Sequence, residues 1–352
     1  MHIYEYLFTA IIILSMLFAS STMITTLSEP SRNVSEREQL KITAQKLMAQ
    51  ILLDPGDPAD WGNDLTVEGN LKTFGLAKHS ETTRDAYVLD PYKVLRLNDA
   101  LLQLDRSLYI PPSRLRDLLN LGNEYGLALE FSPALVVSID KKGSDRYELT
   151  VMSEYGGLPI VGANVTARMY YYDVDSKNVV GTDLIVNETE YRGKCIVDFG
   201  SIPSEMKILI VLVEYYGMRL VRVFSAGSNL IRAHLLGDFL FVDKTCTISR
   251  DEVYEIIVSK RFGGYSIENV ESSLSKIEDG RFRLTYVEPS TVATLTVSQD
   301  GGNLIFSSLE ANVTYSMIAG KWSFPFAYSV ERTVTIGGSL YNLRLYLWRM
   351  SW

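Results

Sequence analysis

The pattern of hydrophobic and polar positions opens with one long apolar run. From Tyr6 to Leu27 the chain contains no charged residue. As a helix this run is about 33 Å long, which matches the hydrocarbon core of a bilayer. The run therefore predicts a transmembrane anchor over residues 1–28. The alternatives are a cleaved signal peptide, whose usual basic start is missing here, and a buried core helix, although few soluble helices are apolar on every side.

A second, amphipathic helix is predicted over residues 29–54. Ser35 and Glu38 form the S/T-x-x-E pattern of a capping box. Apolar residues then recur every three or four positions from Leu40 to Ile51. The helix should end before Pro55, because proline has no backbone N–H group. The apolar stripe packs either on the protein's own sheet, which is the simpler expectation, or against neighbouring copies.

The segment that follows, residues 55–143, has the pattern of a small mixed α/β region. Proline-led stretches predict short helices at 91–98 and 112–121. Two runs rich in β-formers then predict strands at 126–131 and 134–139. A polar stretch after the second strand indicates a domain boundary.

Period-two alternation is clearest over residues 144–226. It predicts strands at 147–152, 163–172, 179–186, 194–199, 207–215 and 218–224. Strands of this length with turns at this spacing suggest a small β-sandwich.

The last segment, residues 227–352, predicts a second β-rich domain that contains one helix. The helix is expected at 250–260, where apolar residues share a helical face. Strands are expected at 330–336 and 340–348, joined as a hairpin by two glycines.

The net charge and the number of cysteines argue against certain partners and against a disulfide-rich fold. The 352-residue chain has a net charge of −8, which argues against a nucleic-acid partner because phosphates need a basic surface. Its two cysteines, Cys195 and Cys246, cannot build a disulfide framework. They form either one bridge or two isolated buried thiols, and we favour the second.

The chain contains no recognisable catalytic constellation. Its three histidines are far apart, and Walker, G-x-G-x-x-G and G-x-S-x-G motifs are absent from the sequence. Ser273 and Lys276 fit S-x-x-K without the partner motifs of that enzyme class. Asp173, Asp175 and Asn178 are better explained by a polar turn than by calcium. We therefore predict no enzyme activity, no cofactor, no metal and no small-molecule substrate.

Four Asn-x-Ser/Thr triplets are candidate glycosylation sites. They lie at Asn33, Asn164, Asn187 and Asn312. Neither flank of the apolar run has a clear excess of Lys or Arg, so the positive-inside rule gives no orientation. Only about five residues precede the apolar run, so the rest of the chain lies on one side of the membrane, and the triplets indicate that this side is extracytoplasmic. The prediction is a single-pass protein of the cell membrane with the bulk of the chain extracytoplasmic.

The N-terminal part resembles the archaeal type IV pilin-like proteins. Mature subunits of that family carry a Glu at the fifth position before an apolar helix, as Glu5 does here. The stretch LLDPGDPADWG at 52–62 is similar to the "LL-x-x-PG-x-P-x-x-W" segment that follows their helix. Residues 89–94 and 118–126 resemble later segments of such proteins, so the resemblance covers about residues 1–140.

The resemblance implies an assembly role for Glu5. In a bundle of apolar helices, its carboxylate would pair with a neighbour's amino terminus, since a buried charge needs a partner. The alternative is an interfacial acid that contacts water. Such pilins also carry a basic leader, whereas Met1 stands where their mature chain begins. Either the reading frame starts upstream, or this relative keeps its anchor unprocessed.

Residues 155–165 resemble the "G-x-P-I-x-G-A-x-V" opening of Ig-like and carboxypeptidase-regulatory-like sandwiches, which implies fold only. The predicted fold class is an N-terminal transmembrane helix extended by an amphipathic helix. A mainly β ectodomain follows, with a small α/β region, an Ig-like β-sandwich and a second β-rich domain.

The predicted function is that of a membrane-anchored extracytoplasmic structural protein of pilin-like design. It would be a minor filament subunit or a filament-associated factor, with the membrane and other pilin-like subunits as partners. The alternatives are a single-pass adhesin or receptor-like protein that does not polymerise, and an anchored hydrolase.

Overall fold

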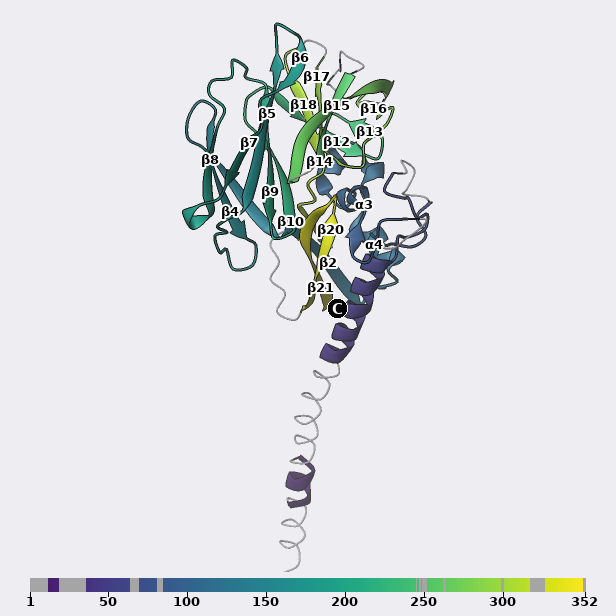
Figure 1. Ribbon diagram of the computed structural model, residues 1–352. Coiled ribbons are helices and arrows are strands. Elements are labelled where there is room, and N and C mark those ends of the chain that lie inside the picture. The colour runs from purple at the N-terminus through teal and green to yellow at the C-terminus, as the bar shows by residue number, and fades with distance from the viewer. Residues whose placement is uncertain are drawn as a thin grey trace, which may run out of the picture.

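A computed structural model describes ten stretches of the chain, and it is mostly β (Figure 1). The described residues are 12–18, 36–63, 70–80, 85–244, 246, 248, 252–261, 264–298, 301–316 and 327–350.

The described part of the predicted membrane anchor is one short helical segment, residues 12–18. Among the described residues, no helix is long and apolar enough to cross a membrane. The predicted transmembrane helix, and with it the predicted single-pass location in the cell membrane, is therefore wrong. Glu5 lies outside the described residues.

The first unit is an antiparallel sheet with a long helix, residues 36–53, packed on one face. The order of its strands is β1-β20-β21-β2-β19, and only β1 pairs in parallel with its neighbour. These strands are β1 (Val88–Leu89), β2 (Tyr125–Pro133), β19 (Val313–Ser316), β20 (Tyr328–Ile336) and β21 (Ser339–Arg349). The predicted hairpin at the end of the chain is confirmed as β20 and β21, with its turn at Gly337 and Gly338.

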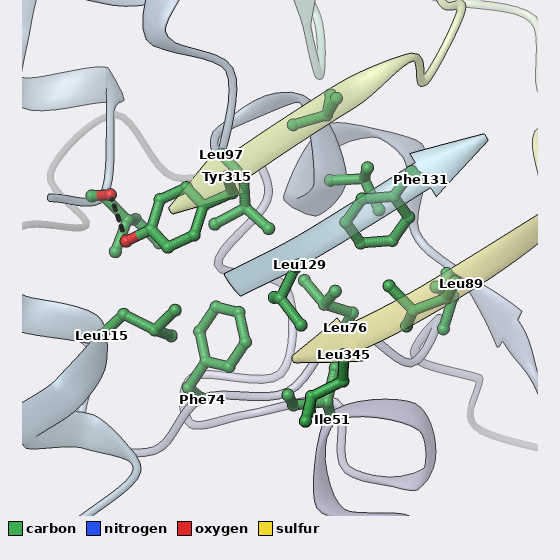
Figure 2. Close-up of a cluster of buried hydrophobic side chains, with 14 of the residues drawn as sticks. Ile51, Phe74, Leu76, Leu89, Leu97, Leu115, Leu129, Phe131, Tyr315 and Leu345 are labelled. Carbon is green, nitrogen blue, oxygen red and sulfur yellow. Dashed lines mark hydrogen bonds between the residues drawn. The ribbon is translucent and has the colours of Figure 1, made fainter. Parts of the chain in front are cut away.

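The apolar stripe of the long helix packs on the sheet of its own chain. Ala44, Met48 and Ile51 are buried on this face, and Figure 2 shows Ile51 close to Leu345 of β21. Burial of a side chain as large as Met48 or Ile51 contributes about 1.5–3 kcal/mol. The short helices of this unit are α3 (Pro91–Leu95), α4 (Pro112–Leu118) and two 3₁₀ turns, Asp99–Gln103 and Arg106–Leu108.

The second unit is the predicted β-sandwich. One sheet contains β3 (Leu135–Lys141), β4 (Arg146–Ser153) and β8 (Lys194–Asp198). The facing sheet contains β5 (Asn164–Asp173), β6 (Asn178–Gly181), β7 (Ile185–Glu188), β9 (Lys207–Tyr215) and β10 (Met218–Ser225). The single strand predicted at 179–186 is divided into β6 and β7. The Met169 N–H of β5 donates to the Thr182 hydroxyl, and the register of pairing with β5 shifts by one residue between Gly181 and Ile185.

The third unit is a single eight-stranded sheet, in the order β11-β18-β17-β14-β15-β16-β13-β12. Its strands are β11 (Leu230–Arg232), β12 (His234–Leu236), β13 (Phe239–Phe241), β14 (Glu252–Arg261), β15 (Gly264–Glu278), β16 (Arg281–Leu284), β17 (Thr291–Val297) and β18 (Leu304–Ser308). The two edge strands, β11 and β12, are joined by Ala233 alone, so the sheet is rolled on itself.

The helix predicted at 250–260 is wrong, because this segment is strand β14. Val253 faces one core, while Tyr254 and Ile256 face another. A strand buried on both faces has a continuous apolar pattern that resembles a helix.

The chain returns to its first sheet after both other units are complete. β2 pairs along its whole length with β21, and β19 pairs with the other side of β2. Figure 1 shows yellow β20 and β21 beside β2. Strands β19, β20 and β21 therefore pack with the first unit, and the sandwich and the rolled sheet are inserted between β2 and β19.

Candidate functional site

The segment after the long helix folds around a buried lysine. The ammonium of Lys93, in α3, donates to the carbonyl oxygens of Pro55 at 2.8 Å, Ala59 at 2.7 Å and Ala77 at 2.9 Å. The side chain is fully buried, and burial lowers the pKa of Lys93. The cation thereby holds three separate stretches of backbone together.

Trp61 completes this cluster. Its indole Nε1 donates to the carbonyls of Pro55 at 3.1 Å and Gly75 at 3.0 Å. The Lys93 ammonium lies 5.8 Å from the Trp61 ring centre, within reach of a cation–π contact. All the donors are directed at backbone carbonyls, so the motif has a structural role and offers no group for chemistry.

The three units meet around Glu310, which lies between the rolled sheet and β19. Its carboxylate accepts from the Val223 backbone N–H at 2.5 Å and from Arg222 Nη1 at 2.7 Å. Both partners belong to β10 of the sandwich. Burial raises the pKa of Glu310, although Arg222 and Val223 act in the opposite direction. This contact covers part of the open edge of β10.

A second contact at the junction comes from Arg219, also in β10. Its Nε donates to the carbonyl of Gly338 in the β20–β21 turn at 3.0 Å. Its guanidinium lies 4.5 Å from the ring centre of Tyr265 in β15. One side chain thus contacts all three units. A cavity of about 20 Å³ beside Glu310 is lined by Val221, Thr291 and Tyr341, again one residue from each unit.

Glu154 joins the sandwich to the open face of the first sheet. Its carboxylate lies 2.9 Å from Arg344 Nη2 and accepts from Asn342 Nδ2 at 2.8 Å. Arg344 also lies 3.3 Å from Glu331. Together with Glu310 and Arg219, these contacts fix the sandwich against the first unit.

The buried carboxyl of Glu310 predicts a pH-dependent stability. Its folded pKa is raised above the ordinary value of 4.5, so the folded state holds this proton more tightly than the unfolded state. The resulting stability is present below pH 4.5 and is lost as the pH rises through the folded pKa. We therefore expect the difference in unfolding free energy, Glu310→Gln minus wild type, to become more positive with rising pH across that window. Denaturant titrations at several pH values measure it, and a flat or falling difference would contradict the assignment.

The candidate glycosylation sites and the two cysteines lie in different parts of the structure. Asn164 and Asn312 are exposed, whereas the Asn187 side chain is half-buried and donates to the Ile196 carbonyl at 2.6 Å. Asn33 lies outside the described residues. Cys195 is buried in the sandwich core and Cys246 in a core of the rolled sheet, so they form no bridge with each other.

Sequence reasoning did not find Glu310, Arg222 or Arg219. The only local signal was an acid between two apolar residues, Leu309 and Ala311, which occurs in many exposed strands. No three His, Cys, Asp or Glu side chains in the described part of the chain are grouped so that they could hold a metal ion.

Comparisons with known proteins give little further information. No protein-family model and no curated protein matches the chain. Among solved structures, trypsin-activated alpha-2-macroglobulin from Escherichia coli is similar at 11% identity and a TM-score of 0.20. The match covers 58% of this chain and 19% of that protein, so the chain spans about a fifth of its length. A similarity at this level supports no argument about fold or function.

Proposed function

We propose that this protein is a non-catalytic structural subunit of pilin-like design, which assembles through its N-terminal helical segment. The observation that supports this most strongly is the exposure of that segment. Six large apolar side chains are between 41% and 73% exposed, namely Ile12, Ile13, Leu14, Met16, Leu17 and Phe18. They are six of the seven residues in this segment, and a helix with so broad an apolar surface is stable in water only when other apolar surface covers it.

The same segment of other copies of the chain is the simplest surface that could bury these apolar side chains. Apolar helices that pack side by side bury their surface at about 25 cal/mol per Å², and bundles are the usual arrangement. The long helix of residues 36–53 is not available for this purpose, since its apolar stripe is buried in its own unit. The contacts at Glu310, Arg219 and Glu154 favour a rigid body suited to a structural role.

The assembly is tested with the full chain and one apolar-to-acid substitution. We expect the wild type to form large species or filaments, by light scattering and electron microscopy. We expect Leu14→Asp to reduce them to single chains, because a charge in the helix bundle has no partner. Val174→Asp is the matched control, since Val174 is also exposed but lies in the β5–β6 turn. Equal assembly by Leu14→Asp and wild type would refute the proposal.

Glu5 stays a prediction within the same proposal. If its carboxylate pairs with a neighbour's amino terminus, Glu5→Ala impairs assembly in the same assay, and normal assembly by that variant would remove this role.

A binding protein that does not polymerise is the second candidate function. The observation that favours a binding function is the exposure of tyrosines and aliphatic side chains at one end of the sandwich. Monomeric wild type at all concentrations would favour it over the structural subunit.

A further inference from the structure

Three loops at one end of the sandwich expose large apolar side chains to solvent. They are the β4–β5 loop (154–163), the β7–β8 turn (189–193) and the β9–β10 turn (216–217). Five side chains in these loops are between 55% and 91% exposed: Tyr155, Leu158, Val161, Tyr191 and Tyr216. Patches of this composition on soluble proteins mark interaction sites.

The pairing of the strands places the three loops at the same end. Asn164 begins β5 directly after the first loop. It pairs with Glu188, just before the second loop, and with Glu214, just before the third. Figure 1 shows β4, β7 and β8 on the side of the molecule away from α4.

Two of the loops are held together by backbone hydrogen bonds. The Gly162 N–H donates to the Thr189 carbonyl at 2.8 Å, and the Thr189 hydroxyl donates to the Ile160 carbonyl at 2.8 Å. A Cβ atom on Gly193 would lie 2.4 Å from the Val151 carbonyl oxygen, so the second loop packs directly on β4. A surface ordered in advance loses little conformational entropy when it binds a partner.

The tips of two loops carry backbone strain. Arg192 and Tyr216 have positive φ angles of 62° and 44°, a region that favours glycine and asparagine. The Arg192 guanidinium lies 5.2 Å from the ring centre of Tyr191, which stays exposed. Strained backbone that presents bulky side chains to solvent is typical of functional sites.

The charges around this end are mostly acidic. Glu188 and Glu190 are exposed and Glu214 is half-buried. Two other cations lie nearby: the Lys194 ammonium pairs with Glu148, and Arg219 lies opposite Glu214 in the β9–β10 ladder. Among the described residues, Glu188 and Glu190 are in no ion pair, and the Arg192 guanidinium lies over the Tyr191 ring. An approaching partner would therefore gain from positive charge.

We propose that this end of the sandwich docks a basic protein segment in which apolar side chains alternate with Lys or Arg. The apolar side chains would cover Leu158 and the tyrosines, and the basic ones would pair with Glu188 and Glu190. A second copy of this end of the sandwich is disfavoured as the occupant, because it would present the same acidic residues, Glu188 and Glu190. The inference does not depend on assembly through residues 12–18.

The test uses a fluorescent peptide in which leucine and tyrosine alternate with lysine, titrated with the full chain. A second peptide has glutamate in place of lysine. Anisotropy should show saturable binding of the lysine peptide only. Leu158→Asp and Tyr191→Ala should each weaken it by at least about tenfold, the size expected when an interface anchor is lost. Both positions are exposed, so the melting temperature of each variant should equal that of wild type.

Val174→Asp is again the control, because Val174 lies at the opposite end of β5. It adds the same charge as Leu158→Asp and should leave binding unchanged. The proposal would be overturned if the lysine peptide did not bind the wild type saturably. It would also be overturned if all variants bound that peptide as tightly as wild type, or if the wild type bound the glutamate peptide equally well. A smaller particle mass for Leu158→Asp than for wild type would identify a second copy as the occupant and would also overturn it.

Discussion

Lys93→Met should destabilise the first unit by about 3 kcal/mol, lowering its melting temperature by roughly 10 °C. Methionine keeps most of the side-chain volume in the buried site but has no donor. The carbonyls of Pro55, Ala59 and Ala77 then lose their shared partner inside the protein. Calorimetry of the full chain measures the effect.

Lys78→Met is the matched control for this substitution. Lys78 is exposed and directly follows Ala77 in the chain, so the same change should alter stability by no more than about 0.5 kcal/mol. Equal melting temperatures for the two variants would mean that the three carbonyl contacts of Lys93 do not support the fold.

Gly75→Ala should have an effect of similar size for a steric reason. A Cβ atom at this position would lie 1.9 Å from the backbone oxygen of Asp54, and backbone cannot rotate away as a side chain can. The two segments would have to separate. This would break the bonds from the Leu76 N–H to Ile51 and from the Ala77 N–H to Asp54. We expect a loss of about 3 kcal/mol.

The control for this substitution is Gly143→Ala in the β3–β4 turn. A Cβ atom there would meet only the Cβ of Arg146 at 3.5 Å, an ordinary contact. Calorimetry should therefore find Gly143→Ala close to wild type and Gly75→Ala about 10 °C lower. A Gly75→Ala protein as stable as wild type would show that the helix end and the segment after it do not approach this closely.

Local pattern predicted most individual elements, because alternation reports directly on a strand with one buried face. The predicted strands at 147–152 and 207–215 differ from β4 and β9 by at most one residue at each end. The same rule failed for β14, where burial on both faces removes the alternation. Periodicity cannot distinguish such a strand from a buried helix.

The pairing of strands that are far apart in the sequence could not be predicted from local hydrophobic pattern. The pairing of β2 with β21 joins residues about 200 positions apart, and neither strand carries a signal for its partner. The apolar run at the N-terminus predicted a membrane helix from length and hydropathy alone, whereas no helix among the described residues is long and apolar enough to cross a membrane.

The candidate sites were predictable only in part. The sequence motif at 52–62 contains Pro55, Ala59 and Trp61, but nothing in it identifies Lys93 as the cation that joins them. Glu310 and Arg222 become a pair only when the rolled sheet and the sandwich are both in place. Of the exposed tyrosines in the sandwich loops, Tyr155 had a signal in the sequence, because Gly156 and Gly157 mark its loop as a tight turn.

Assembly through the N-terminal segment is the central claim, and the particle mass of the purified full chain tests it most directly. Light scattering over a range of concentrations should give multiples of the mass of one chain, rising with concentration, and a single-chain mass for Leu14→Asp. A wild-type chain that keeps the mass of one chain at every concentration would contradict the claim.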